Sequence, residues 1–72
     1  MNMSVAKKIK LLLVERDMTM TDLAEKLNTG KSNLSQKMQR DNFSEKELKE
    51  IAEVLNCDYN IIFIMNDTGK QI

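Results

Sequence analysis

The order of apolar and polar residues divides most of the chain into stretches with a period of three to four, which predicts helices with one buried side. The first helix is expected from about Ser4, a residue suited to an N-cap, to Arg16. A second, short helix should follow Thr19, because Asp22 three residues later places a carboxylate at the positive end of that helix. It should end near Asn28, which tolerates a left-handed backbone at low cost.

Two further helices complete this pattern. The third is predicted over residues 31–39, where only two residues are apolar and none of the others is acidic. Ser44 and Glu47 have the spacing of a capping box, so we expect a fourth helix to begin there and to end at Asn56. The apolar residues that these four helices should bury are Val5, Ile9, Leu12, Leu13, Leu23, Ala24, Leu27, Leu34, Met38, Leu48, Ile51, Ala52 and Leu55.

The residues after the fourth helix change to a β-type pattern. Residues 59–65 are rich in β-branched and aromatic side chains, which predicts a single strand, and residues 66–69 have the composition of a turn. Both faces of this strand would be apolar in the middle, and residues 70–72 are too few to make a good partner strand. We therefore expect two copies of the chain to pair through antiparallel strands centred near Ile62 and Phe63. The residues of this dimer interface would be Tyr59, Ile61, Ile62, Phe63, Ile64 and Met65.

The length of 72 residues allows one small domain, and the composition is that of a globular chain, with 42% hydrophobic and 31% charged residues. A core this small usually needs a metal, disulfides or self-association. The chain has no histidine and a single cysteine, Cys57, so self-association is the expected support. Together with the helical pattern, this predicts an all-α fold of four to five helices with a single C-terminal strand that dimerises.

The net charge is zero, but the charges are unevenly distributed along the chain. Residues 1–40 hold eight bases and four acids, whereas residues 41–72 hold three bases and seven acids. A basic half is the usual electrostatic requirement for a polyanionic partner such as DNA. The alternative is that these charges only solvate the exposed faces of the helices.

The composition excludes several classes of chemistry. Without histidine there is no Ser–His or Cys–His nucleophile pair, and there is no glycine-rich phosphate loop, so we expect no enzyme. We also expect no cofactor and no metal site, and Cys57 should fill space rather than act in redox chemistry. The longest apolar runs are too short to span a bilayer and no secretory signal is recognisable, so the expected location is the cytoplasm.

Residues 19–41 have the features that two short helices need in order to cross at a tight turn. Ala24 is small enough for the second of these helices to cross it closely, and Asn28 tolerates the positive φ that the turn requires. Leucines on both helices would fix the crossing through apolar contacts. The second helix would then present a polar face without acids, and such a face suits the base edges in the major groove of DNA.

With these features the chain resembles the phage-repressor and Cro-like helix-turn-helix family, also called the xenobiotic-response-element class of bacterial regulators. The resemblance covers about residues 5–56 and is carried by Thr19, Leu23-Ala24, Leu27-Asn28, Ser32-Asn33-Leu34-Ser35 and the segment from Phe43-Ser44 to Leu55. The departures from the family pattern are Met20 in place of a frequent glutamine, Asn28-Thr29 in place of glycine and an aliphatic residue, Lys37 in place of an apolar residue, and Met38 in place of a frequent acidic residue.

The resemblance implies a transcriptional regulator, a repressor from a bacterial, phage or mobile-element context, with a recognition helix over residues 31–39. The implied base readers are Lys31, Ser32 and Gln36. The implied supporting contacts to the DNA backbone are Thr21, Asn33, Ser35, Lys37, Arg40 and Asn42. Residues 1–57 would form the DNA-binding domain, and residues 58–72 would form the dimerising strand and tail.

A second function remains open for the same fold. The chain would then be an antitoxin or anti-repressor that binds another protein through the fourth helix and the strand. The neutral net charge and the acidic second half of the chain favour this slightly. Salt-sensitive binding to DNA would favour the regulator, whereas a stoichiometric protein complex that salt does not weaken would favour the protein-binding module.

Overall fold

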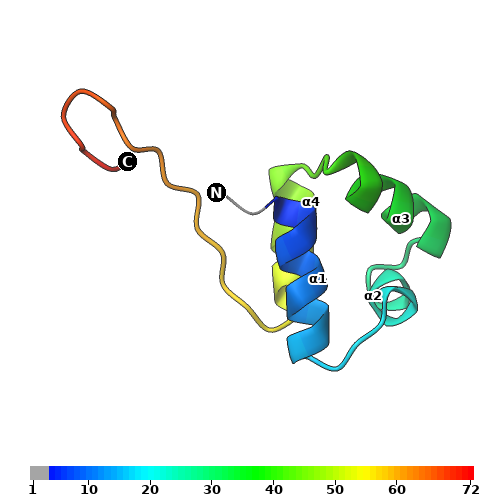
Figure 1. Cartoon of the computed structure of the whole chain (residues 1–72). Coiled ribbons are helices and arrows are strands. Elements are labelled where there is room, and N and C mark those ends of the chain that lie inside the picture. The colour runs from blue at the N-terminus through cyan, green and yellow to red at the C-terminus, as the bar shows by residue number, and fades with distance from the viewer. Residues whose placement is uncertain (1–3) are drawn as a thin grey trace.

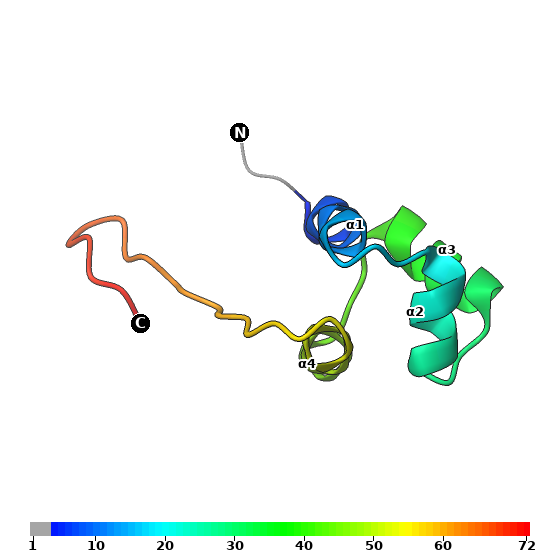
Figure 2. The same ribbon diagram turned by 90° about the horizontal axis from the view of Figure 1, so that it is seen from below.

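The structure is a computed structural model that describes residues 4–72, and these residues contain four helices. The helices are α1 (Val5–Glu15), α2 (Met20–Lys26), α3 (Lys31–Arg40) and α4 (Glu45–Val54). α1 and α4 lie on one side of the domain and α2 and α3 on the other (Figure 1, Figure 2). The prediction of an all-α fold is confirmed. Within the described residues, no helix has the length and apolar character needed to cross a bilayer.

The predicted N-caps begin three of the four helices. The Ser4 hydroxyl accepts a hydrogen bond from a backbone N–H in the first turn of α1, at 3.1 Å. Thr19 and Asp22 form a complete capping box at the start of α2, and Ser44 and Glu47 form another at the start of α4. These side chains bind backbone N–H groups that have no partner inside their own helix, which explains why the helices begin where the sequence predicts.

Each of the four helices ends beside an aspartate or asparagine with a left-handed backbone. The φ angles of these residues lie between 53° and 61°, a conformation that costs aspartate and asparagine less than most other residue types. The prediction of helix ends near Asn28 and Asn56 is confirmed. The two other residues in this conformation, which the sequence analysis did not identify, are Asp17 and Asp41.

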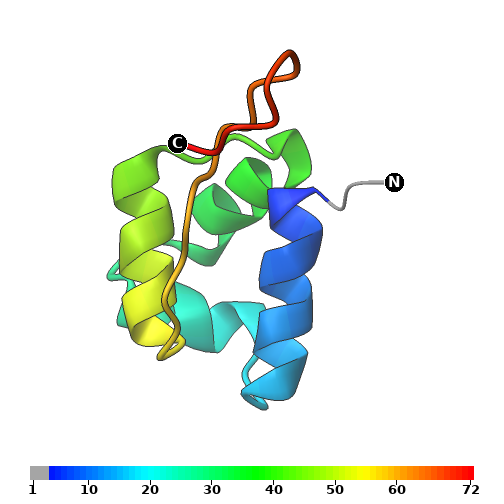
Figure 3. The ribbon, with the colours of Figure 1, turned by 90° about the vertical axis from the view of Figure 1, so that its left-hand side faces the viewer.

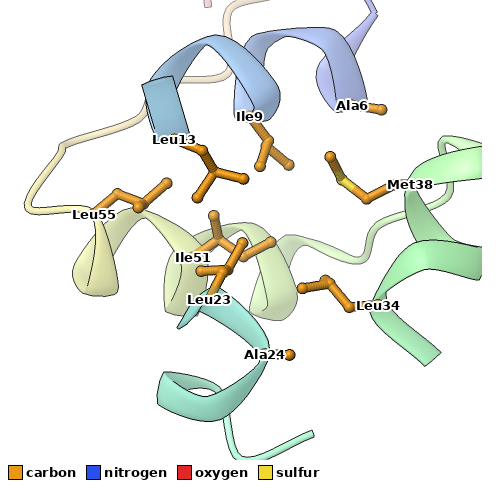
Figure 4. Packing of buried hydrophobic residues seen from close by; sticks show 9 residues of the cluster. All are labelled: Ala6, Ile9, Leu13, Leu23, Ala24, Leu34, Met38, Ile51 and Leu55. Carbon is orange, nitrogen blue, oxygen red and sulfur yellow. The ribbon is translucent and has the colours of Figure 1, made fainter. Parts of the chain in front are cut away.

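The core is one cluster to which all four helices contribute (Figure 4). Leu23 of α2 is fully buried, and Leu55, directly after α4, is 1% exposed. Ala24 and Leu34 are buried where α2 and α3 meet, as predicted, whereas Val5 is 39% exposed and lies outside the core. The buried members of the cluster are Ala6, Ile9, Leu13, Leu23, Ala24, Leu34, Met38, Ile51 and Leu55. Three of the predicted core residues are only half-buried, namely Leu12, Leu27 and Leu48.

Residues 58–72 form a segment that we name the arm. The prediction of a strand over residues 59–65 of this segment was wrong. Within the described part of the chain no strand of that length is present. The arm is extended instead and leaves the helical body as a separate segment (Figure 1, Figure 3). Residues 70–72 fold back onto it, and one β-bridge joins Ile64 to Gln71.

The turn and the lack of a partner strand explain this difference. Gly69 has a positive φ of 76°, and its N–H donates to the Met65 carbonyl at 2.7 Å, which closes the turn. The backbones of Phe63 and Ile72 then exchange two hydrogen bonds, at 3.0 and 2.9 Å. Residues 59–62 have no neighbouring strand in a single chain, so their backbone groups are left to bind water.

Long-range hydrogen bonds fix α3 and α4 relative to α1. Asp41 follows α3 directly, and its Oδ1 accepts a hydrogen bond at 2.7 Å from the Ala6 N–H in the first turn of α1. The Arg16 guanidinium after α1 donates to the carbonyls of Leu55 and Asn56, at 2.8 and 3.1 Å. Arg16 therefore caps the end of α4, and the Asp41 carboxylate connects the end of α3 to the start of α1 through a hydrogen bond.

Candidate DNA-binding surface

The helices α2 and α3 pack against each other across a short turn. Ala24 of α2 is 3% exposed and Leu34 of α3 is 2% exposed, so the two helices approach closely. Inside the turn, Asn28 has a φ of 61°, and the Thr29 N–H donates to the Ala24 carbonyl at 3.0 Å. This is the geometry of a helix-turn-helix, in which one side of α3 packs on the body while the other faces solvent (Figure 1).

Two of the three predicted base readers, Ser32 and Gln36, lie on the outward side of α3, whereas Lys31 lies in the first turn of the helix, closer to the side that packs on the body. Lys31, Ser32 and Gln36 are all exposed. Because a helix turns by about 100° per residue, Gln36 lies opposite the buried Leu34 and Met38 and projects farthest from the body. The helix contains no acidic residue, so this side of α3 is polar and does not repel a phosphate backbone.

Gln39 and Arg40 extend this outward side toward the end of α3. Both are exposed. Arg40 was predicted as a contact to the DNA backbone, whereas the sequence analysis did not select Gln39. The spacing of the sequence does indicate that Gln39 lies near Gln36, because residues three or four apart share one face of a helix.

Asn33 and Lys37 lie on the flank of α3 that faces α4, rather than on its outermost side. The Asn33 amide donates to the Thr29 Oγ1 at 3.0 Å, and Lys37 forms an ion pair with Glu47 of α4. Lys37 is half-buried at a position where the resemblance implies an apolar residue. Its ion pair with Glu47 explains how a lysine is accommodated between α3 and α4.

The other three predicted contacts to the DNA backbone, Thr21, Ser35 and Asn42, are exposed. Thr21 lies in the first turn of α2, beside the capping box. Hydrogen bonding by Thr19, first from its backbone N–H and then through its side chain, lowers the pKa of the Asp22 carboxyl. A negative charge therefore stands at the start of α2, so a phosphate there would have to contact the Thr21 side chain rather than the end of the helix.

The Glu47 carboxyl links α3 to α4 and is held in its charged form. Its hydrogen bond from Lys37, and then the one from the Ser44 N–H at 3.0 Å, lower the pKa of Glu47 from 4.5 to about 2. The same carboxylate therefore serves the ion pair with α3 and the capping box of α4. Protonation of Glu47 would weaken both.

We expect the free energy of unfolding to decrease as the pH falls from about 4.5 toward 2. Over this range the unfolded chain binds a proton at Glu47 that the folded chain does not yet bind, whereas above pH 4.5 the contribution of Glu47 is fully present. Glu47→Gln should remove this part of the pH dependence and lower stability by less than about 1 kcal/mol, because the ion pair is partly exposed to solvent.

The measurement is urea denaturation at several pH values between 2 and 7, followed by circular dichroism. Glu53→Gln is the matched control, because Glu53 is exposed on the same helix and forms no ion pair with another residue of the range 4–72. An equal flattening of the pH dependence in both variants would contradict the role given to Glu47.

The predicted interface residues of the arm are exposed, with one exception. The exposed fractions lie between 41% and 71% for Ile61, Ile62, Phe63, Ile64 and Met65. Tyr59 is half-buried at the base of the arm, and its hydroxyl donates to Glu45 Oε1 of α4 at 3.3 Å. A contiguous run of exposed apolar side chains is unusual in a soluble monomer.

Comparison with known proteins agrees with this geometry. The family of the Cro/C1-type HTH DNA-binding domain matches residues 8–67. The match includes α2, the turn, α3 and α4 completely, together with most of α1 and part of the arm. Neither a curated protein nor a solved structure matches the chain at a significant level. The chain belongs to the Cro/C1-type helix-turn-helix family of DNA-binding domains.

Proposed function

We propose that the chain is a transcriptional repressor that binds a specific DNA sequence as a homodimer, with α3 in the major groove. The observation that carries this proposal is the outward side of α3, which is exposed, polar and free of acidic residues along the whole helix. The major groove is wide enough for a helix, and each base pair presents there a distinct pattern of donors and acceptors. Repression would follow if the bound dimer covers a promoter.

Three exposed side chains of α3 would read the bases. The Gln36 amide donates and accepts at once, so it is suited to the two adjacent groups of an adenine. Lys31 would donate to the acceptors of a guanine, and the Ser32 hydroxyl matches either purine. Gln36 would contribute most to sequence preference because it projects farthest from the body.

The supporting residues would bind phosphates beside the reading surface. Arg40 is exposed in the last turn of α3. The Lys37 ammonium would contact both the Glu47 carboxylate and a phosphate. The Asn33 amide donates one N–H to Thr29, so its second N–H and its carbonyl oxygen are not used by that hydrogen bond. The complete set is Thr21, Asn33, Ser35, Lys37, Arg40 and Asn42.

The arm would join two copies of the chain. Burying one exposed side chain such as Phe63 stabilises a complex by about 1.5–3 kcal/mol, and five neighbouring apolar residues are available. A two-fold axis would place two α3 helices on one palindromic site. The interface would contain Ile61, Ile62, Phe63, Ile64 and Met65, with Tyr59 at the base of the arm.

Selection from a random library of DNA duplexes is expected to return an inverted repeat whose half-sites are centred about 10 base pairs apart. Affinity for that site should fall steeply with salt, because each neutralised phosphate releases about 0.9 counterion. The measurement is electrophoretic retardation of the selected duplex between 50 and 200 mM salt, a range suited to resolve this dependence. Failure to enrich any site, or an affinity that salt leaves unchanged, would contradict the proposed function.

The acidic second half of the chain supports one alternative, a protein-binding antitoxin or anti-repressor. Residues 41–72 carry seven acids and three bases, and they include the exposed arm. Such a module would bind its partner through α4 and the arm and would not need α3. A stoichiometric complex with a protein that persists at high salt, together with no DNA site after selection, would favour this alternative.

A further inference from the structure

Three of the predicted contacts to the DNA backbone lie close together, at the flank of α3 that faces α4. Asn33 and Lys37 are one helical turn apart, and both line the groove between α3 and α4. Asn42 lies beside them, because its N–H donates to the Lys37 carbonyl at 3.2 Å. Lys37 is the one cation of the three, so a phosphate next to this flank depends on Lys37 for its electrostatic attraction.

The Lys37 ammonium is already bound by a carboxylate of the next helix. It forms an ion pair with Glu47 of α4, and the two side chains are 36% and 30% exposed. An ion pair that is open to water to this extent contributes little net stability, so a phosphate can displace it without unfolding the chain. While the ion pair persists, the charge of Lys37 is partly neutralised and acts less strongly on a phosphate.

Glu47 uses the two kinds of donor that a phosphate would use at this place. One is the Lys37 ammonium, and the other is the Ser44 N–H at the start of α4, which donates to Glu47 Oε1 at 3.0 Å. Lysine side chains and the N–H groups at a helix start both commonly bind phosphates. The hydrogen bonds from Lys37 and then from Ser44 lower the pKa of Glu47 to about 2, so the carboxylate is charged at neutral pH.

We infer that Glu47 competes with the DNA phosphate for Lys37 and thereby lowers the affinity for DNA, an inference that rests on the DNA-binding function proposed above. In the complex Lys37 contacts both groups, and its contact with Glu47 reduces the charge that it presents to the phosphate. A phosphate contact carries no sequence information. Glu47 therefore lowers the affinity for all duplexes by one factor and leaves the discrimination between bases unchanged.

A second acid of α4 allows the contact of Glu47 with Lys37 to be separated from its charge alone. Glu50 lines the same groove between α3 and α4. It is exposed, and within residues 4–72 it forms no ion pair. Exposed charges that are not in contact are screened by salt over about 8–10 Å. Glu50 should therefore affect DNA binding less than Glu47 does.

The test compares Glu47→Gln with Glu50→Gln in the full chain. Glutamine also occurs at this position of a capping box, so Glu47→Gln keeps an acceptor for the Ser44 N–H and loses only the charge. Its affinity for the selected duplex should rise about two- to fivefold at about 50 mM salt, the factor expected for an exposed ion pair. The logarithmic dependence of its affinity on salt should become steeper by up to about 0.9, the counterion released per neutralised phosphate. Glu50→Gln should change both quantities less than about half as much.

Lys37→Met provides the second control, because methionine has a long unbranched side chain without the charge. In this background Glu47 has no ammonium to bind, so Glu47→Gln and Glu50→Gln should raise the affinity by the same small factor. A panel of duplexes with single base changes should show an unchanged ratio of affinities between duplexes for Glu47→Gln. Electrophoretic retardation measures the affinities, and circular dichroism checks that each variant is folded.

Three outcomes would overturn the competition between Glu47 and the phosphate while DNA binding itself stays intact. Equal gains in Glu47→Gln and Glu50→Gln would show only a general effect of charge. An unchanged or lower affinity of folded Glu47→Gln would show that Glu47 does not withhold Lys37 and instead orients it or has no part in binding. A gain that persists in full with Lys37→Met would show that Glu47 acts without Lys37. Failure of the unmodified chain to bind any duplex would instead remove the proposed function, and the competition with it.

Discussion

Leu23→Ala is expected to lower the free energy of unfolding by about 2–5 kcal/mol, the cost of removing a buried leucine side chain and leaving a cavity. Leu23 is fully buried and lies among residues of the other helices (Figure 4). A core in a chain of this size rarely supplies more than about 3–5 kcal/mol in total. The variant should therefore be largely unfolded at 37 °C, and urea denaturation followed by circular dichroism measures the loss.

The control for this prediction is Leu11→Ala. It removes the same atoms from α1, but Leu11 is 50% exposed, so we expect a change within about 0.5 kcal/mol. Similar losses of unfolding free energy in the two variants would contradict the fully buried position of Leu23 in the core. DNA affinity of Leu23→Ala should fall together with the folded fraction rather than at one base pair only.

Gln36→Ala should reduce affinity for the preferred base by about 1–3 kcal/mol and relax the preference at that position, because a bidentate contact of the amide is lost. Arg40→Ala should instead weaken binding to all sequences by a similar factor, since a phosphate contact carries no sequence information. The measurement is the affinity of each variant for a panel of duplexes with single base changes in the selected site.

Gln39→Ala is the comparison that separates the two glutamines of α3. Both are exposed, but Gln36 lies opposite the buried side of the helix, whereas Gln39 lies closer to its flank. We expect the larger and more position-specific loss for Gln36. Equal losses across the whole panel for Gln36→Ala would remove this residue from the base readers.

The helices could be predicted from the sequence because their ends are determined locally. Thr19 with Asp22, and Ser44 with Glu47, are capping boxes that depend only on residues three positions apart, and both are formed. The period of the apolar residues then gives the buried side of each helix. The buried positions of Ala24 and Leu34 follow from the same reasoning.

The environment of individual site residues could not be predicted in this way, because it depends on contacts between helices. The ion pair of Lys37 with Glu47 joins residues ten positions apart in two helices, and no short-range pattern indicates it. The predicted strand failed for a related reason. Residues 59–65 have β-type side chains, but a strand needs a partner, and a single chain provides only residues 70–72.

The left-handed residues at the four helix ends have a consequence for how this sequence can change in evolution. Glycine takes the same conformation without strain, so Asp17, Asn28 and Asn56 can drift among asparagine, aspartate and glycine while the helices still end at the same points. Asp41 is different, because its carboxylate also binds the Ala6 N–H. Among descendants of this sequence the position of Asp41 should therefore be restricted to residues that keep this acceptor, and it should diverge more slowly than the other three.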